Sequence, residues 1–250
     1  MMLRWAFIGA GRHPRLWIAP GMAQAANAEA VGVWNRTRAQ AEALVTERGM
    51  PRVYDTMQDL LADSTVDAVV IATPNNLHAS HALAALRAGK HVLVEKPMAV
   101  EVPDALEMIR VARAAGRALG VGFHLRHHAL IAEVRRRITN GEIGAIHYAA
   151  ANFNLTSSAP PRANIPHGAW KQDAEQMGGA GALMGMGIHL VDMLRYLIGG
   201  EITAVSAVAG GVTSEQPLEN FDQALLEFAG GIRAHITYGG QFPLSAPFQG

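Results

Sequence analysis

Short apolar runs alternate with amphipathic stretches through the first 120 residues, and this alternation limits the fold more than any other feature. The runs are LRWAFIG, AEAVGVW, DAVVIAT, HVLVEK and ALGVGF, and the stretches between them have helical spacing. Runs that stay apolar on both sides are typical of strands in a parallel sheet covered on both faces. The pattern predicts an α/β fold with a doubly wound parallel sheet over residues 1–122.

The rhythm changes near residue 124, which predicts a second domain over residues 123–250. HALIAEVRRRITNGEIG and ALMGMGIHLVDMLRYLIGG read as helices, and TSSAPPRANIPHGAW reads as a long polar loop. AIHYAAANFNL, ITAVSAVAGG, NFDQALLEFAGG and IRAHITYGG read as strands, the later ones joined by glycine pairs. We therefore expect an α+β domain with an open, mainly antiparallel sheet.

The composition narrows the range of partners. Lys+Arg and Asp+Glu both number 21, so no net field attracts nucleic acid or an acidic membrane surface. The absence of cysteine excludes disulfides and thiolate metal sites and fits a reducing compartment. The N-terminus lacks a signal-peptide layout, and no apolar run approaches the roughly 20 residues of a membrane span. We expect a cytoplasmic protein with neither nucleic acid nor membrane as partner.

The segment FIGAGRHP places Gly9 and Gly11 directly after the first predicted strand. The first glycine permits a tight turn, and the second lets a pyrophosphate approach the backbone at a helix N-terminus. Pro14 stands where the usual third glycine would be. An ordinary strand–helix turn is the competing interpretation.

The second predicted strand ends in VWNRTR, where a dinucleotide fold faces the adenosine ribose. Asn35, Arg36, Thr37 and Arg38 stand there, with no carboxylate to repel a 2′-phosphate and with guanidinium groups to bind one. This favours NADP over NAD, although a solvated helix start with Thr37 as N-cap would have the same residues.

ATPNNLHASH follows the third strand, at the end of the sheet where ligands bind. His78 could instead be a helix-start histidine with no ligand. The residues expected to contact the cofactor are Gly9, Gly11, Arg12, His13, Asn35, Arg36, Thr37, Arg38, Thr73, Pro74, Asn75, His78, Glu95 and Lys96.

HVLVEKPMAV places an ammonium group at the tip of a core strand. Pro97 fixes its own φ and disfavours the helical region for Lys96, so the lysine is held at a defined position. A structural salt bridge with Glu95 is the competing interpretation, but neighbouring strand residues point to opposite faces.

Taken together, GAGR, ATPNNLH, AGKHVLVEKP and GIHLVDMLRYL resemble the Gfo/Idh/MocA oxidoreductases, over roughly residues 3–240. The resemblance implies a Rossmann domain followed by a domain whose open sheet forms an oligomer interface, here a homodimer or homotetramer. It implies reversible hydride transfer between NAD(P) and a carbinol carbon of a sugar or polyol. GFHLRHH and GRHPRLW add a narrower similarity to the NADPH-dependent 1,5-anhydrofructose reductase branch.

Carried over by motif, Lys96 and His189 are the expected catalytic residues. Lys96 would stabilise the reacting oxygen, and His189 would donate the proton, because imidazole titrates near neutral pH. A buried histidine without this role is the competing interpretation of His189. Many members carry an aspartate four residues before this histidine, and here that position is Gly185, for which close helix packing is the simpler explanation.

Five further residues are predicted to face the substrate: His124, Arg126, Trp170, Lys171 and Asp192. Trp170 and Lys171 could equally be ordinary surface-loop residues, and Asp192 could be structural. His124, His127 and His128 have spacings that could suit a metal, but no carboxylate or thiolate joins them nearby, so we expect none.

Two departures from the family leave other functions open. Gly185 and the length of 250 residues, short for this family, are compatible with a nicotinamide-binding regulatory protein without turnover. A glycosidase of the same fold that uses nicotinamide transiently is a third possibility. The chain could be a natural short form or a fragment.

Overall fold

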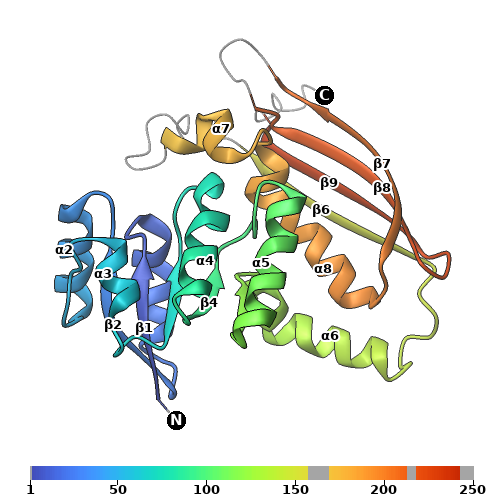
Figure 1. Ribbon diagram of the computed structural model, residues 1–250. Helices are drawn as coiled ribbons and strands as arrows, with labels where there is room; N and C mark the ends of the chain where they lie inside the picture. The colour runs from blue at the N-terminus through green and yellow to red at the C-terminus, as the bar shows by residue number, and fades with distance from the viewer. Residues whose placement is uncertain (1, 157–168, 213–217, 243–250) are drawn as a thin grey trace. The chain divides into compact units, whose positions relative to one another are not determined.

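The computed structural model describes residues 2–156, 169–212 and 218–242. These form two compact units, which divide between Gly122 and Phe123 (Figure 1). Most of the polar loop expected at residues 156–170 lies outside the described residues.

Five parallel strands form the sheet of the first unit. They are β1 (Leu3–Ile8), β2 (Ala28–Trp34), β3 (Ala68–Ile71), β4 (His91–Val94) and β5 (Leu119–Val121), in the order β2-β1-β3-β4-β5. A single parallel bridge from Val33 to Val53 extends the sheet beyond β2. The strand order reverses direction between β1 and β3, and in doubly wound folds ligands bind outside the carboxyl ends of the strands at that point.

Helices cover both faces of this sheet, as the doubly wound pattern predicts. The helical segments are η1 (Pro14–Ile18), α1 (Ala19–Met22), α2 (Arg38–Arg48), α3 (Met57–Ala62), η2 (Asn75–Leu77), α4 (His78–Arg87) and α5 (Val102–Ala115). Phe7 and Val70 pack with α1 and α2 on one face, whereas Ile8, Val69 and Ile71 pack with α3, α4 and α5 on the other. The alternation along each strand thus divides the apolar core into two layers.

The second unit contains a four-stranded mixed sheet. Its strands are β6 (Tyr148–Thr156), β7 (Ile202–Gly210), β8 (Phe221–Phe228) and β9 (Arg233–Phe242), in the order β6-β9-β8-β7. β7, β8 and β9 pair antiparallel, whereas β6 pairs parallel with β9. The expected open, mainly antiparallel sheet is therefore present, with one parallel pairing at the β6 edge.

The central helix of the second unit's core is α8 (Ile188–Ile198), which follows η6 (Leu183–Gly187). Leu190 and Leu194 of α8 pack against Leu226, Phe228 and Ile236 on one face of the sheet. The remaining segments are η3 (His124–His127), α6 (Ala129–Thr139), η5 (Ala169–Gln172) and α7 (Ala174–Met177). None of the helices in the described ranges has the length and apolar character needed to cross a bilayer.

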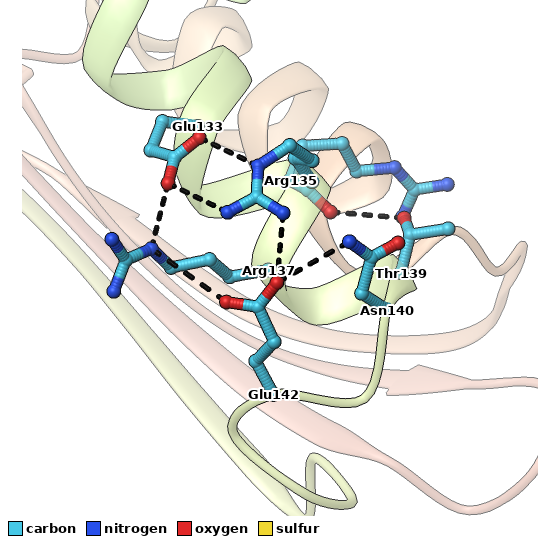
Figure 2. A network of polar contacts seen from close by, with 7 residues as sticks. Glu133, Arg135, Arg137, Thr139, Asn140 and Glu142 are labelled. Atoms are coloured by element: carbon cyan, nitrogen blue, oxygen red, sulfur yellow. Dashed lines mark hydrogen bonds and ion pairs between the residues drawn. The ribbon is translucent and has the colours of Figure 1, made fainter.

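The end of α6 carries a network of charged side chains (Figure 2). Arg136 and Arg137 both bind the carboxylate of Glu133, and Arg136 also binds Glu142 at 2.7 Å. Arg136, Arg137 and Glu142 are exposed and Glu133 is partly exposed, and such surface ion pairs each contribute about 1 kcal/mol or less. We therefore interpret this network as a solvated helix face rather than a functional cluster.

Candidate functional site

The glycine loop after β1 makes a close backbone approach to the end of β3. Gly9 has φ of 108°, and a Cβ there would lie 2.5 Å from the carbonyl oxygen of Ala72, so no other residue fits. A Cβ on Gly11 would meet no atom of the described chain within 4 Å. Gly9 thus serves the fold, whereas Gly11 leaves open space where the next helix begins, at residue 12. This arrangement fits a pyrophosphate bound at a helix N-terminus.

The polar side chains after β2 differ in whether they already bind other residues of the protein. Asn35 accepts a hydrogen bond from the Ala10 amide at 3.0 Å and donates to Thr37 and Gln40, so its side chain is engaged within the protein. Arg38 forms ion pairs with Glu42 and Asp55. Arg36 is exposed and makes no hydrogen bond or ion pair with the described residues. Of the two arginines expected to bind phosphate, only Arg36 keeps its guanidinium available.

Thr37 occupies the N-cap position of α2, as the competing interpretation of this segment anticipated. Its side chain makes no capping hydrogen bond to the helix. The carbonyl of Thr37 instead accepts from the Asn35 side chain and from the Gln40 amide. The segment is therefore organised by Asn35 rather than by a threonine cap.

Behind the loop after β3 lies His78, the first residue of α4, which is 1% exposed. One ring nitrogen of His78 is 2.7 Å from the carbonyl oxygen of Pro97, and the other is 2.9 Å from that of Thr73. Asn75 is also buried, at 4% exposure, whereas Thr73 and Pro74 are partly exposed. Because its ring is buried, His78 can affect the cofactor site only by positioning the two loops that it contacts.

The tip of β4 holds three ionisable side chains together. Glu95 Oε1 lies 3.0 Å from Nε2 of His13, and Glu95 Oε2 accepts from the backbone N–H of Lys96. Burial acts to raise the pKa of Glu95, but the His13 hydrogen bond and the charges of His13 and Lys96 outweigh it and lower the pKa. The Lys96 side chain is partly buried beside this carboxylate. Glu95 is thus kept ionised, next to the lysine expected to act on substrate.

In the second unit, His189 lies on α8 with 4% exposure. Its ring meets the rings of His124 and Phe123 edge to face, with centroid separations of 5.1 and 6.0 Å. His124 belongs to η3, so a residue expected at the substrate site packs directly on the expected catalytic histidine.

Arg126 and Asp192, both predicted to face the substrate, bind each other. Arg126 Nε donates to Asp192 at 2.7 Å, and its second guanidinium nitrogen donates to the other carboxylate oxygen. The Arg126 guanidinium also lies over the rings of Phe123 and Tyr196. The hydrogen bond to Asp192 raises the pKa of Arg126. This pair anchors η3 to α8 and so holds His124 against His189.

The explanation of Gly185 as a close-packing glycine is wrong. A Cβ at Gly185 would meet no atom of the described chain within 4 Å, whereas one at Gly181 would lie 2.6 Å from the Glu219 carbonyl oxygen. Gly187 is also tight, with 3.2 Å to a methyl carbon of Leu183. Close packing therefore requires small residues on either side of Gly185, but not at Gly185 itself.

The other predicted residues are less informative. Trp170 and Lys171 lie on η5, where the Lys171 ammonium sits 5.7 Å from the centroid of the Trp170 ring. Within the described residues, no group of three or more histidine, aspartate or glutamate side chains is placed to hold a metal.

Sequence reasoning missed one unusual carboxyl group, Asp222 on β8. It is 8% exposed, and its Oδ2 has no hydrogen-bond partner among the described residues. Burial and the charge of Glu219 raise the pKa of Asp222 to about 6. The available signal was a charged residue at a buried position of the alternating strand FDQALLEF.

Two family models match the chain. Residues 3–123 match the oxidoreductase family with an NAD-binding Rossmann fold, and residues 131–246 match the GFO/IDH/MocA C-terminal domain. The chain therefore belongs to the Gfo/Idh/MocA oxidoreductase family, as its motifs predicted.

Individual relatives agree with this assignment. A 1,5-anhydro-D-fructose reductase of Ensifer adhaerens is 36% identical over 238 residues, covering 94% of this chain and 68% of the relative. A D-glucoside 3-dehydrogenase of Escherichia coli K12 is 34% identical over 197 residues, covering 79% of this chain but only 54% of the relative. Aldose-aldose oxidoreductase from Caulobacter crescentus, in a crystal structure with glycerol, superposes with a TM-score of 0.87 at 28% identity, covering 97% of this chain and 72% of that one. The chain thus spans about half to three quarters of the length of these proteins.

Proposed function

We propose that this protein transfers a hydride between NADP and a carbinol or carbonyl carbon of a sugar or polyol. The observation that carries the proposal is the tip of β4, where Glu95, Lys96 and Pro97 follow a buried strand of a family-assigned Rossmann domain. The named relatives are sugar dehydrogenases and reductases, which favours turnover over the regulatory and glycosidase alternatives.

In this proposal the nicotinamide cofactor supplies the hydride, and the chain supplies position, charge and a proton. Lys96 donates a hydrogen bond to the reacting oxygen and stabilises the negative charge that develops there. His189 exchanges the proton with that oxygen as general acid or base. His124, edge to face with His189, and the Arg126–Asp192 pair keep the imidazole in position.

The preference for NADP rests on the residues after β2. No carboxylate stands at the ribose position, and the exposed Arg36 has its full hydrogen-bonding capacity left for a 2′-phosphate. The open space at Gly11 and the exposed Arg12 at the helix start fit the pyrophosphate of either cofactor. Arg36 is therefore the residue that would discriminate between them.

A panel of aldoses, ketoses and inositols with both cofactors tests the function directly. Net change of absorbance at the nicotinamide band is expected with at least one sugar or polyol. Product formation with no net cofactor change would indicate the transient use of nicotinamide made by glycosidases of this fold. Tight cofactor binding without any turnover would favour the regulatory alternative.

We also propose a cytoplasmic homodimer or homotetramer that associates through the face of the second sheet opposite α8. Leu225 and Val208 lie on that face and are 61% and 62% exposed. Val205 is a matched control: it is 61% exposed but pairs with the buried Leu226, so it points to the α8 side.

Light scattering at micromolar concentration tests the association. The unmodified protein should be at least a dimer, Leu225→Arg should shift it toward monomer, and Val205→Arg should leave it unchanged. A monomeric parent protein would contradict the proposal.

A further inference from the structure

His78 links the two loops that carry the candidate site. Its Nδ1 lies 2.7 Å from the carbonyl oxygen of Pro97, in the loop after β4. Its Nε2 lies 2.9 Å from the carbonyl oxygen of Thr73, in the loop after β3. The ring is 1% exposed, so no water competes for these contacts. A single side chain thus bridges the loop of the cofactor-site residues and the loop of Lys96.

The chemistry of the bridge is asymmetric. Carbonyl oxygens only accept hydrogen bonds, and a neutral imidazole has one N–H donor. Burial lowers the pKa of His78, against the opposing effects of the two carbonyls and of the Glu95 charge, while the Lys96 charge adds to the lowering. Burial also lowers the pKa of His81, three residues further along α4, and the charge of His78 adds to that lowering. A neutral ring can satisfy only one of the two carbonyls, and the contact to Pro97 is the shorter one.

We propose that His78 is a positioning residue that donates from Nδ1 to the Pro97 carbonyl and thereby fixes where Lys96 presents its ammonium group. On the other side of the ring, the unprotonated Nε2 faces the Thr73 carbonyl oxygen without a hydrogen bond, because both atoms are acceptors. This inference rests on the proposed role of Lys96 in hydride transfer. Lys96 directly precedes Pro97, so a displaced Pro97 carbonyl moves the lysine backbone with it.

Two amide substitutions separate the two contacts. In His78→Asn the amide nitrogen replaces Nδ1, so the bond to Pro97 is kept and the contact to Thr73 is lost. In His78→Gln the amide nitrogen reaches the position of Nε2, so the bond to Thr73 is made and that to Pro97 is lost. His91→Asn is the matched control, because His91 begins β4, at the end of the strand away from this loop.

We expect the two variants to differ in turnover. His78→Gln should lower kcat about tenfold or more while cofactor affinity stays within about twofold, because a small misplacement of a reacting group is costly. His78→Asn should keep both kcat and cofactor affinity within about threefold of the parent protein, because the donor to Pro97 is kept. A purely structural role would lower both parameters in both variants in proportion to lost stability, and that result would overturn the proposal.

A measurement on the unmodified protein does not depend on the variants folding. Ring nitrogen NMR at neutral pH should show a proton on Nδ1 of His78. A ring protonated only at Nε2 would overturn the proposal. If no sugar or polyol is turned over, the proposed function fails, but the tautomer of His78 and the Lys96 amide shift in the two variants still decide this inference.

Discussion

Two carboxyl groups, Glu95 in the first unit and Asp222 in the second, have pKa values shifted in opposite directions. Glu95, at the tip of β4, is 17% exposed at its side chain and binds His13 and the Lys96 amide. Asp222, on β8, is 8% exposed, and its Oδ2 has no partner in the described part of the chain. The pKa of Glu95 is lowered, whereas that of Asp222 is raised to about 6.

Burial acts to raise the pKa of both groups, and only at Glu95 do hydrogen bonds and positive neighbours reverse the direction of the shift. The first unit assembles a charged cluster around its lysine, which suits stabilisation of a developing oxyanion. The second unit instead places aromatic rings against its histidine, and the Arg126–Asp192 ion pair begins one helical turn further along α8. We propose that the first unit stabilises the developing charge through Lys96 and that the second unit transfers the proton through His189.

The largest expected effect comes from removing the ammonium group of Lys96 in the first unit. Lys96→Ala should lower turnover on the order of 10²-fold or more, the size found for loss of one charge-stabilising donor. Cofactor affinity should change little, because the proposed role of Lys96 is on the substrate oxygen. Steady-state kinetics on a substrate that the parent protein uses, with cofactor titration, measures both quantities. Full turnover in Lys96→Ala would contradict the proposal that Lys96 stabilises the charge developing on the substrate oxygen.

The two carboxyl groups should also give opposite dependences of stability on pH. The folded pKa of Asp222, about 6, is above its unfolded value of 3.8, so its favourable contribution exists below pH 3.8 and is lost as pH rises through 6. Asp222→Asn should therefore raise the free energy of unfolding by roughly 1–3 kcal/mol above pH 6 and by little near pH 4. Denaturant unfolding at both pH values measures the difference.

Glu95→Gln is the contrasting variant. The lowered pKa of Glu95 means that its contribution is present above its unfolded value of 4.5 and is lost as pH falls. This substitution should destabilise the protein at neutral pH and matter less in acid. If both substitutions shift stability in the same direction at neutral pH, the contrast between the two units is wrong.

The sequence predicted the first unit better than the second for a physical reason. Apolar runs and glycines report local backbone requirements, so AEAVGVW corresponds residue for residue to β2 and Gly49 ends α2 in the left-handed conformation. The six-residue helix α3 was missed because its apolar pattern is too short to register.

Contacts between distant residues leave no local pattern. Arg126 and Asp192 are 66 positions apart, and each was assigned separately to the substrate. The contacts of His78 with Pro97 and Thr73 could not be seen either, because the ring position depends on where two loops meet. The family motifs named candidate residues, but only the structure shows which of them engage one another.

A smaller effect should separate the two arginines after β2. Arg36→Ala should reduce the preference for NADPH over NADH by about tenfold, the value of one charge-assisted hydrogen bond. Arg38→Ala is the matched control and should change the preference less, because Arg38 already pairs with Glu42 and Asp55. Dissociation constants for both cofactors, by fluorescence titration, measure the ratio. Equal affinities for the two cofactors in the unmodified protein would contradict the NADP assignment.

The smallest expected effect comes from adding a carboxylate to the second unit. Gly185→Asp places a carboxylate one helical turn before His189, where many family members have one, and nothing in the described chain obstructs its Cβ. A negative charge there stabilises the protonated imidazole, so turnover should rise about three- to tenfold, a fraction of what general acid–base catalysis supplies. Gly185→Asn is the control, because it gains the same helix propensity without the charge. Both variants should keep the cofactor affinity of the parent. If Asp and Asn change turnover equally, His189 needs no acidic partner, and its contacts with His124 and Phe123 suffice to position it.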